Sequence, residues 1–210
     1  MYTKLAHHTA YFHLALSNIY MTIIQMCSFL EKFILLYLLL ERFKHLNRNI
    51  AENVSWDEER RTEPNAIKIS DVKIMHSMLY NAHETFKDIY RVPLLFSFTY
   101  LMMCIVANLS YFRKESILIG CSFVLPPLIL MLIMCTICHL TAEEANNIAC
   151  VLSKSMTMLV NSGKTTTKIA ALTYFLHNYV SFDAAGFFTI DLPLFQSVVA
   201  TITTYFIILF

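Results

Sequence analysis

Charged residues are scarce in this chain, and glycine is nearly absent. Of 210 residues, 15% are Asp, Glu, Lys or Arg and 3 are glycine, while 57% are hydrophobic. An ordinary soluble domain carries about 25% charged residues, so the composition argues against one. A disordered chain is excluded, because it would lack the apolar side chains that are abundant here. The formal net charge of +1 leaves no overall basic surface, so we expect no nucleic-acid partner.

Charge is missing altogether from four long stretches. These are residues 5–30, 92–112, 116–142 and 192–210. A helix of about 20 apolar residues crosses the hydrocarbon core of a bilayer. The runs do not alternate as the strands of a membrane β-barrel do, which leaves helices as the spanning structure. The sequence therefore predicts an all-α membrane protein with four spans, or a piece of a larger one.

The expected helices extend beyond the bilayer. The predicted spans are residues 12–38, 92–112, 117–140 and 190–210. The first span could also lie lower, near residues 20–40, because apolar residues resume after Glu31 and Lys32; this pair would then lie within the span and face protein or water. Helical periodicity predicts further helices outside the bilayer at residues 39–50, 66–91, 141–161 and 168–182. Residues 52–65, which lack periodicity and contain a proline, are expected to form an exposed loop.

The helix expected at residues 66–91 has an apolar stripe at spacings of three and four, typical of a helix that packs on other helices. Its members are Val72, Met75, Leu79, Ala82, Phe86 and Ile89. A similar stripe continues the first span: Leu39, Phe43, Leu46 and Ile50.

With four crossings, the charged segments share one side of the membrane. Most Lys and Arg residues lie in these charged segments, which favours their side as the cytoplasmic one. The segments on that side are also far longer, so charge alone does not settle the orientation. The prediction is a transmembrane bundle standing on a cytoplasmic helical layer.

Motifs for catalysis or cofactors are weak. Cys135, Cys138 and His139 match the C-x-x-C-H pattern of haem attachment, but they end a long uncharged run in which helix packing explains them better. A haem-bearing membrane protein stays as a minor alternative. The sequence has no nucleophile–base pair, no carboxylate dyad in a span and no metal signature. We therefore expect no enzyme activity, no metal and no cofactor.

Two adjacent prolines, Pro126 and Pro127, interrupt the third predicted span. Proline removes a backbone hydrogen bond and bends a helix. In a channel or transporter such a bend can act as a hinge, and in a static bundle it is only a bend. The sequence leaves both interpretations open.

The last part of the chain carries the most specific sequence motifs. Residues 185–191 read Ala-Gly-Phe-Phe-Thr-Ile-Asp, and Thr204 and Tyr205 precede five hydrophobic residues. These two motifs resemble the insect gustatory receptor family of the arthropod chemoreceptors, in which such segments begin and fill the last span. The matching positions are Gly186, Phe187, Ile190, Asp191, Thr204 and Tyr205. The Gln-Phe that closes the family motif would fall at positions 211 and 212.

The resemblance implies that the chain corresponds to spans four to seven of a seven-span receptor. Members of this family resemble tetrameric, ligand-gated cation channels whose last span lines a central pore and whose cytoplasmic helices join the subunits. The implied partners are a small-molecule tastant, other receptor subunits in a homo- or hetero-tetramer, and membrane lipid. The implied location is the plasma membrane of chemosensory neurons. Without the first three spans, we expect this chain alone not to respond to a ligand.

The last span has one face suited to a pore. Stepping back by three or four residues from position 211 gives Ser197, Ala200, Thr201, Thr204 and Ile208. Small and hydroxyl side chains suit a water-filled path, and a ring of Ile208 side chains can gate by dewetting. Alternatively, the hydroxyls only bond back to their own helix or pack between neighbours.

Two further alternatives stay open. Asp191 stands where the last helix begins, where it can cap the first turn or attract cations to the inner mouth of a pore. The competing function for the whole chain is a four-span structural or scaffolding membrane protein that conducts nothing.

Overall fold

The computed structural model describes residues 2–55, 67–109, 117–157 and 172–209, and within them the side chains of residues 20, 23–51, 68–109, 120–152 and 172–208. Two compact units make up the chain, Met1–Leu35 and Leu36–Phe210. The first belongs to helix α1 (Tyr2–Asn53). In it the buried Lys32 donates from Nζ to the carbonyl oxygen and to Oγ of Ser28, at 3.2 and 2.6 Å.

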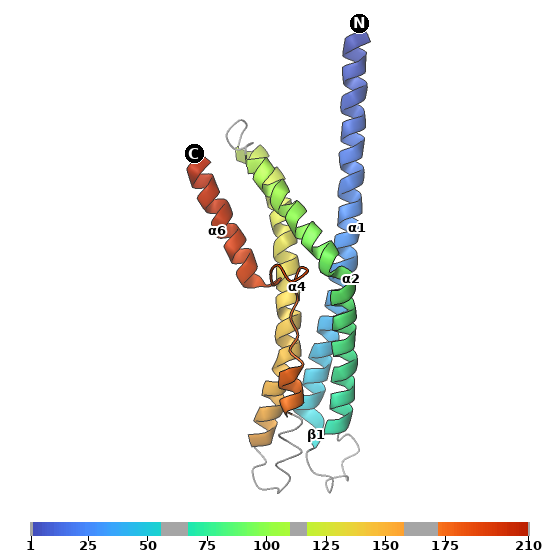
Figure 1. Cartoon of the computed structure of the whole chain (residues 1–210), viewed down its shortest axis with the longest axis vertical. Helices are drawn as coiled ribbons and strands as arrows, with labels where there is room; N and C mark the ends of the chain where they lie inside the picture. The colour runs from blue at the N-terminus through green and yellow to red at the C-terminus, as the bar shows by residue number, and fades with distance from the viewer. Residues whose placement is uncertain (1, 56–66, 110–116, 158–171, 210) are drawn as a thin grey trace. The chain divides into compact units, whose positions relative to one another are not determined.

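The second unit holds the end of α1 and three further long helices. They are α2 (Ile69–Leu109), α4 (Ile117–Thr157) and α6 (Leu192–Leu209), with a short helix at 172–177. Helix α4 packs on both α2 and α6 (Figure 1). Strands β1 (Val54–Ser55) and β2 (Ile67–Lys68) form a two-residue parallel pair. The prediction of an all-α fold is confirmed, since these two short strands are the only ones in the part of the chain that the structure describes.

Prolines lie inside two of the long helices without ending them. Helix α2 continues through Pro93, and its ribbon changes direction partway along its length (Figure 1). Proline removes one hydrogen bond from the helix ladder, which is the usual cause of such a kink. Helix α4 likewise continues through Pro126 and Pro127.

Several element boundaries differ from expectation. Residues 67–68 pair with β1 instead of starting a helix, and 54–55 pair with them instead of lying in a loop. Residues 178–182 are not helical, because the Val180 peptide bonds to a side chain of α4. Helix α6 begins at Leu192, not at residue 190. Residues 52–53 of the expected loop belong to α1 instead, and residues 56–65 lie outside the described residues. The same holds for the ends of the elements expected at 92–112 and 141–161 and for the start of the one expected at 168–182.

The apolar stripe of α1 is buried as predicted, from Leu39 to Ile50. The stripe predicted on α2 is partly wrong. Val72 and Phe86 are buried, but Ile89 is exposed, and His76 and His83 occupy buried positions. Aromatic rings from residues 172–182 cover these two histidines, so a polar residue type faces the core of α2.

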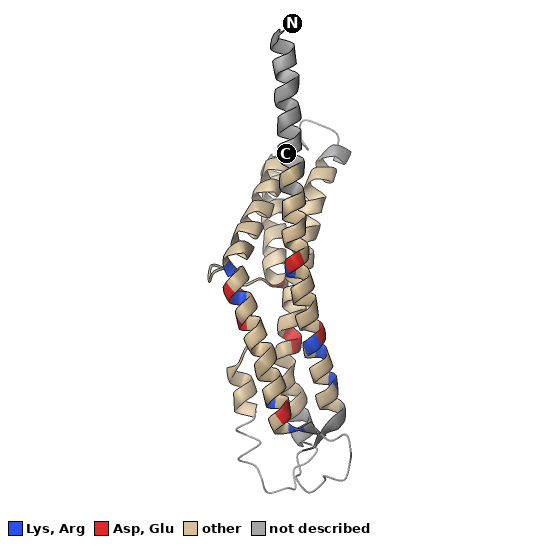
Figure 2. Ribbon diagram, turned by 90° about the vertical axis from the view of Figure 1, so that its right-hand side faces the viewer, with Lys and Arg blue, Asp and Glu red and all other residues tan. Residues whose placement is uncertain are grey.

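In the second unit, charged residues and long uncharged stretches occupy different parts of the helices. Charged residues lie toward the lower part of these helices, and the upper parts of α2, α4 and α6 have none (Figure 2). Among the described residues, three helices are long and apolar enough to cross a membrane: Ile23–Ala51, Ile69–Leu109 and Gly120–Leu152. The shorter helix α6, with 18 residues, is about 27 Å long at 1.5 Å per residue, close to the thickness of a hydrocarbon core.

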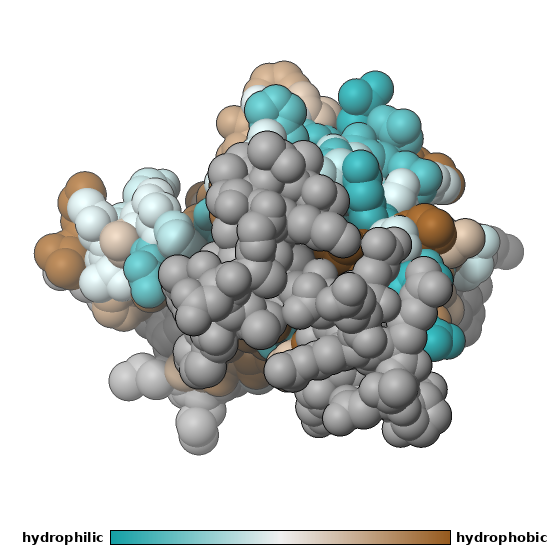
Figure 3. All heavy atoms as spheres, turned by 90° about the horizontal axis from the view of Figure 1, so that it is seen from below, coloured by the Kyte–Doolittle hydropathy of each residue, from teal (hydrophilic) through white to brown (hydrophobic). Residues whose placement is uncertain are grey.

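Large hydrophobic side chains are also exposed along the apolar parts of α2 and α4. Phe96 and Met103 of α2 and Phe123 of α4 are each at least half exposed. A soluble surface would not carry so many, whereas lipid or neighbouring helices can cover them. From below, hydrophilic side chains gather on one part of the described surface (Figure 3).

Candidate functional site

Helix α6 packs against α4 through one narrow face. Val198 is buried, and Ile202 and Phe206, one and two turns later, are half-buried. Residues four apart stack on the same side of a helix, so these three define the face that holds α6 to α4. From Gln196 onward, the other described side chains of α6 are exposed in the single chain.

The predicted pore positions lie on an open face of α6. Ser197, Ala200, Thr201, Thr204 and Ile208 are all exposed, Ile208 by 76%. Ser197 Oγ donates to the Pro193 carbonyl at 3.0 Å, and Thr204 Oγ1 donates to the Ala200 carbonyl at 2.9 Å. The hydroxyls therefore bond back to their own helix, which satisfies their protons without removing small polar atoms from the surface. The structure places these five residues together on one open side of α6 but leaves their role untested.

Residues 178–191, here called the α6 linker, connect the 172–177 helix to α6. At its end, Asp191 Oδ1 accepts from the Leu194 amide at 2.9 Å, and its Oδ2 accepts from Thr189 Oγ1 at 3.3 Å. This is the geometry of a side chain that caps the first turn of a helix. The capping interpretation of Asp191 is therefore observed, and its carboxylate can still carry charge beside α6.

A tight turn in the linker explains the motif residues before α6. Ala185 and Gly186 both have positive φ angles, of 53° and 77°. Glycine adopts this left-handed region at little cost, whereas alanine is strained there. The Phe187 amide closes the turn on the Ala184 carbonyl at 3.0 Å, leaving the Phe187 side chain 77% exposed and Ile190 buried.

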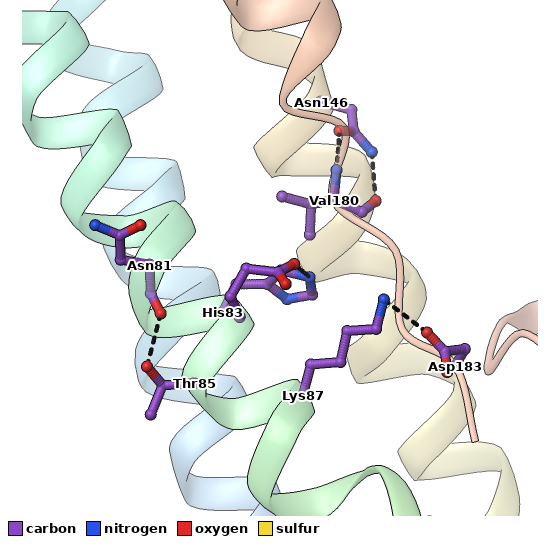
Figure 4. A network of polar contacts seen from close by, with 8 residues as sticks. Asn81, His83, Thr85, Lys87, Asn146, Val180 and Asp183 are labelled. Atoms are coloured by element: carbon purple, nitrogen blue, oxygen red, sulfur yellow. Dashed lines mark hydrogen bonds and ion pairs between the residues drawn. The ribbon is translucent and has the colours of Figure 1, made fainter. Parts of the chain in front are cut away.

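Asp183 ties this turn to α2. Its Oδ2 accepts from Lys87 Nζ at 2.8 Å (Figure 4). Its Oδ1 accepts from the Gly186 amide at 2.7 Å. Burial favours the neutral carboxyl, but the hydrogen bonds from Lys87 and Gly186 outweigh it and hold the pKa of Asp183 below its usual range. The same hydrogen bond raises the pKa of Lys87. One carboxylate thus joins α2 to the turn that leads into α6.

Asn146 fixes the linker to α4. Its Oδ1 accepts from the Val180 amide, and its Nδ2 donates to the Val180 carbonyl, both at 2.9 Å (Figure 4). The carboxamide thus pairs with both backbone groups of one residue. The start of the linker is held by α4 and its middle by α2.

Sequence reasoning missed the residues that hold the linker. These are Lys87, Asn146 and Asp183, together with the buried His76 and His83. A signal was available for the histidines, because they lie four residues after Val72 and three before Phe86, in step with the buried face. Nothing in the sequence pairs Asn146 with Val180, which lies 34 residues away.

No metal or haem site is apparent in the described residues. They contain no group of three or more His, Cys, Asp or Glu side chains that could hold a metal ion. Cys135 and Cys138 are both buried in α4, inside the packed part of a helix rather than in an exposed loop where haem attaches.

Apolar helices of membrane-crossing length, with a further apolar helix held at its start by a polar linker, define a multi-pass helical membrane protein. The family model of the 7tm chemosensory receptors matches residues 1–210, and the chain belongs to this family. The predicted place among the insect chemoreceptors is therefore confirmed. A comparison with the curated proteins gives no match.

Two solved structures resemble the fold. The insect olfactory receptor OR5 from Machilis hrabei matches with a TM-score of 0.68 at 19% identity, over 87% of this chain and 47% of that one. The same receptor in complex with eugenol matches with a TM-score of 0.64 at 17% identity, over the same shares. At such identities the likeness concerns the fold alone. This chain spans less than half the length of the receptor it matches.

Proposed function

We propose that this chain is part of a gustatory receptor subunit, a tastant-gated cation channel in the plasma membrane of chemosensory neurons, and that α6 lines its pore. The observation that carries the proposal is the open face of α6. There Ser197, Thr201 and Thr204 form a row of small hydroxyl side chains that are all exposed in the single chain. Repeated around a tetramer axis, such a file gives a water-filled path with a hydrophobic ring at Ile208.

The gustatory assignment is supported by the two sequence motifs in and before α6. The motif before α6 forms a specific structure, with Gly186 in the left-handed turn, Ile190 buried and Asp191 capping the helix. Each position therefore has a physical reason for its residue type. Under this proposal the ligand is a small-molecule tastant, and the subunits form a homo- or hetero-tetramer in lipid.

Cation selectivity has a candidate in Asp191. Its two carboxylate oxygens accept hydrogen bonds from uncharged donors, so its negative charge is not neutralised by an ion pair in the described residues. Four such charges at the mouth of a pore would raise the local cation concentration. Under this proposal, Asp191→Asn lowers single-channel cation conductance, and Asp191→Glu restores part of it.

The test of the pore face is a pair of tryptophan substitutions in the full-length receptor. Thr204→Trp places a large side chain on the proposed pore face, and Thr203→Trp places the same side chain on another exposed part of α6. We expect tastant-evoked whole-cell current to be abolished by the first and retained by the second, at equal surface expression. Equal currents in both variants would overturn the pore face. A receptor that reaches the surface but never conducts would instead favour a scaffolding protein.

A further inference from the structure

Two histidines hold the 172–182 segment on α2 in the same way. His76 and His83 lie seven residues apart on one face of α2, and each is only 1% exposed. Phe175 lies edge-to-face with His76, with ring centroids 4.9 Å apart, and Phe182 lies edge-to-face with His83, at 4.7 Å. The two phenylalanines are also seven residues apart. The segment thus meets α2 through two matched His–Phe contacts.

Each imidazole is buried without its full set of hydrogen bonds. Nδ1 of His76 and Nδ1 of His83 have no hydrogen-bond partner among the described residues. Buried polar atoms in proteins are normally paired, so two exceptions about two turns apart on one docking face call for an explanation. A neutral imidazole with an unprotonated Nδ1 tolerates this position, whereas a second ring proton would be a buried donor without an acceptor.

The groups around His76 are almost all uncharged. They are the rings of Phe43 from α1, Tyr80 from α2, and Tyr174 and Phe175 from the 172–177 helix. The nearby charge is Lys73, whose Nζ lies 4.4 Å from the Tyr174 ring centroid. None of these groups can neutralise an imidazolium.

Charged groups do surround His83, but they oppose one another. Glu84 Oε1 lies 3.6 Å from His83 Nε2, on a side chain that is 42% exposed. Lys87 and Asp183 lie nearby and are paired with each other. On the neighbouring helix α4, the Glu144 carboxylate accepts a hydrogen bond from Asn47 of α1.

Burial therefore decides the protonation state. It lowers the pKa of His76 to about 4, and it lowers the pKa of His83 to about 4 with help from Lys87 and against Asp183. Aromatic faces can attract a cation, but they compensate for only part of the lost hydration. At neutral pH both rings are neutral and the segment is docked.

We propose that His76 and His83 make the docking of residues 172–183 on α2 sensitive to protons, so that acidification on the cytoplasmic side of the membrane releases the segment. Once both rings take up a proton, the segment must expose them to water. Release of this segment would also free Asp183 and the α6 linker, which fixes the start of α6. This consequence for α6 rests on the proposed channel function, in which acidification of the cytoplasm would change gating.

The test does not require a recording of channel current. Hydrogen exchange followed by mass spectrometry is measured on this chain in lipid nanodiscs at pH 7.5 and pH 5, with rates corrected for intrinsic chemical exchange. We expect protection of residues 172–183 to fall about tenfold or more at pH 5, because an exposed histidine is protonated at that pH whereas a docked one stays neutral, so protons favour the released segment. Protection of α4 at residues 131–148, which is held by apolar contacts, should stay within about twofold. Unchanged protection of residues 172–183 would overturn the proposal.

Substitutions assign the effect to the two rings. In His76→Phe with His83→Phe, which keeps an aromatic ring at each position but removes the titratable group, protection should be independent of pH. His177→Phe, at an exposed histidine of the same segment, is the matched control and should keep the full response. If the double variant does not fold, each single variant should lose part of the response. A fall that is as large in the double variant as in the unmodified chain, or that neither single variant reduces, would also overturn the proposal.

Discussion

The carboxylate of Asp183 accepts a hydrogen bond from Lys87 Nζ at 2.8 Å, and this contact joins two segments that lie almost a hundred residues apart in the chain. Both side chains are less than a third exposed, so the pair is partly shielded from solvent. The other oxygen of the same carboxylate holds the Gly186 amide. The position of the turn that precedes α6 therefore depends on a residue of α2.

We predict that Asp183→Asn destabilises the fold more than Lys87→Met. The first change weakens both the ion pair and the bond to Gly186, which should cost about 1–3 kcal/mol in the free energy of unfolding. The second leaves the bond to Gly186 in place and should cost about 1 kcal/mol. Equilibrium unfolding in detergent micelles measures both. Lys44→Met removes a more exposed ion pair with Glu41 and should change stability by less than about 0.5 kcal/mol. Equal effects of all three changes would contradict this account.

Asn146 offers a second prediction, on α4. Asn146→Ala removes both hydrogen bonds to the Val180 backbone and should cost about 1–2 kcal/mol in the free energy of unfolding. Hydrogen exchange at the Val180 amide should accelerate, because water replaces the lost acceptor. Asn147→Ala, at the exposed neighbouring position, is the control and should leave that amide protected. If Val180 stays protected in Asn146→Ala, another group holds the linker.

The turn before α6 allows a reciprocal test. At Gly186 an added Cβ would meet no atom within 4 Å, so Gly186→Ala should cost only the backbone strain of its positive φ, about 1 kcal/mol. Ala185→Gly relieves a similar strain but makes the unfolded chain more flexible, so its net effect should lie within about 0.5 kcal/mol of zero. Thermal unfolding of the two variants compares them. A larger loss for Ala185→Gly than for Gly186→Ala would show that the φ angles do not govern this turn.

Hydropathy and periodicity predicted the helices well, because both depend on neighbours within a few residues. The stripe from Leu39 to Ile50 needed only the 3.6-residue period to place its buried face. The same reasoning placed Ile89 in the core of α2, where it is 59% exposed, since it treats any apolar residue in register as buried.

The contacts that hold the linker could not be predicted, because they join residues distant in the sequence. Phe175 and Phe182 help to bury His76 and His83, and no local pattern of α2 indicates those rings. The family motif did locate the residues before α6, and the structure supplied the reasons for them. Asp191 caps the helix, and Gly186 adopts a left-handed φ.

Buried histidines make stability depend on pH with a definite sign. Burial lowers the pKa of His76 and of His83 to about 4, below the value near 6.5 in the unfolded chain. The folded state therefore binds fewer protons, and stability is full above pH 6.5 and falls as the pH drops toward 4. The loss should reach at most about 3 kcal/mol for each histidine. Equilibrium unfolding across this range measures it. In the variant with phenylalanine at both positions, the slope between pH 6.5 and 4 should flatten, and a steep slope there would assign the loss to other groups.

The gate proposed at Ile208 can be tested by making its ring smaller. Ile208 is 76% exposed on α6, so a substitution there disturbs little packing within the chain. If four Ile208 side chains close the pore by excluding water, Ile208→Ala lets water enter and raises the current without tastant, by about tenfold. Ile207→Ala, at an apolar neighbour that is 70% exposed, changes another face of the same helix and should leave the basal current unchanged. Whole-cell recording from the full-length receptor compares the two variants. A basal current that rises equally in both would place the constriction elsewhere on the helix, and one that rises only in Ile207→Ala would assign the gate to the neighbouring exposed face that carries Ile207.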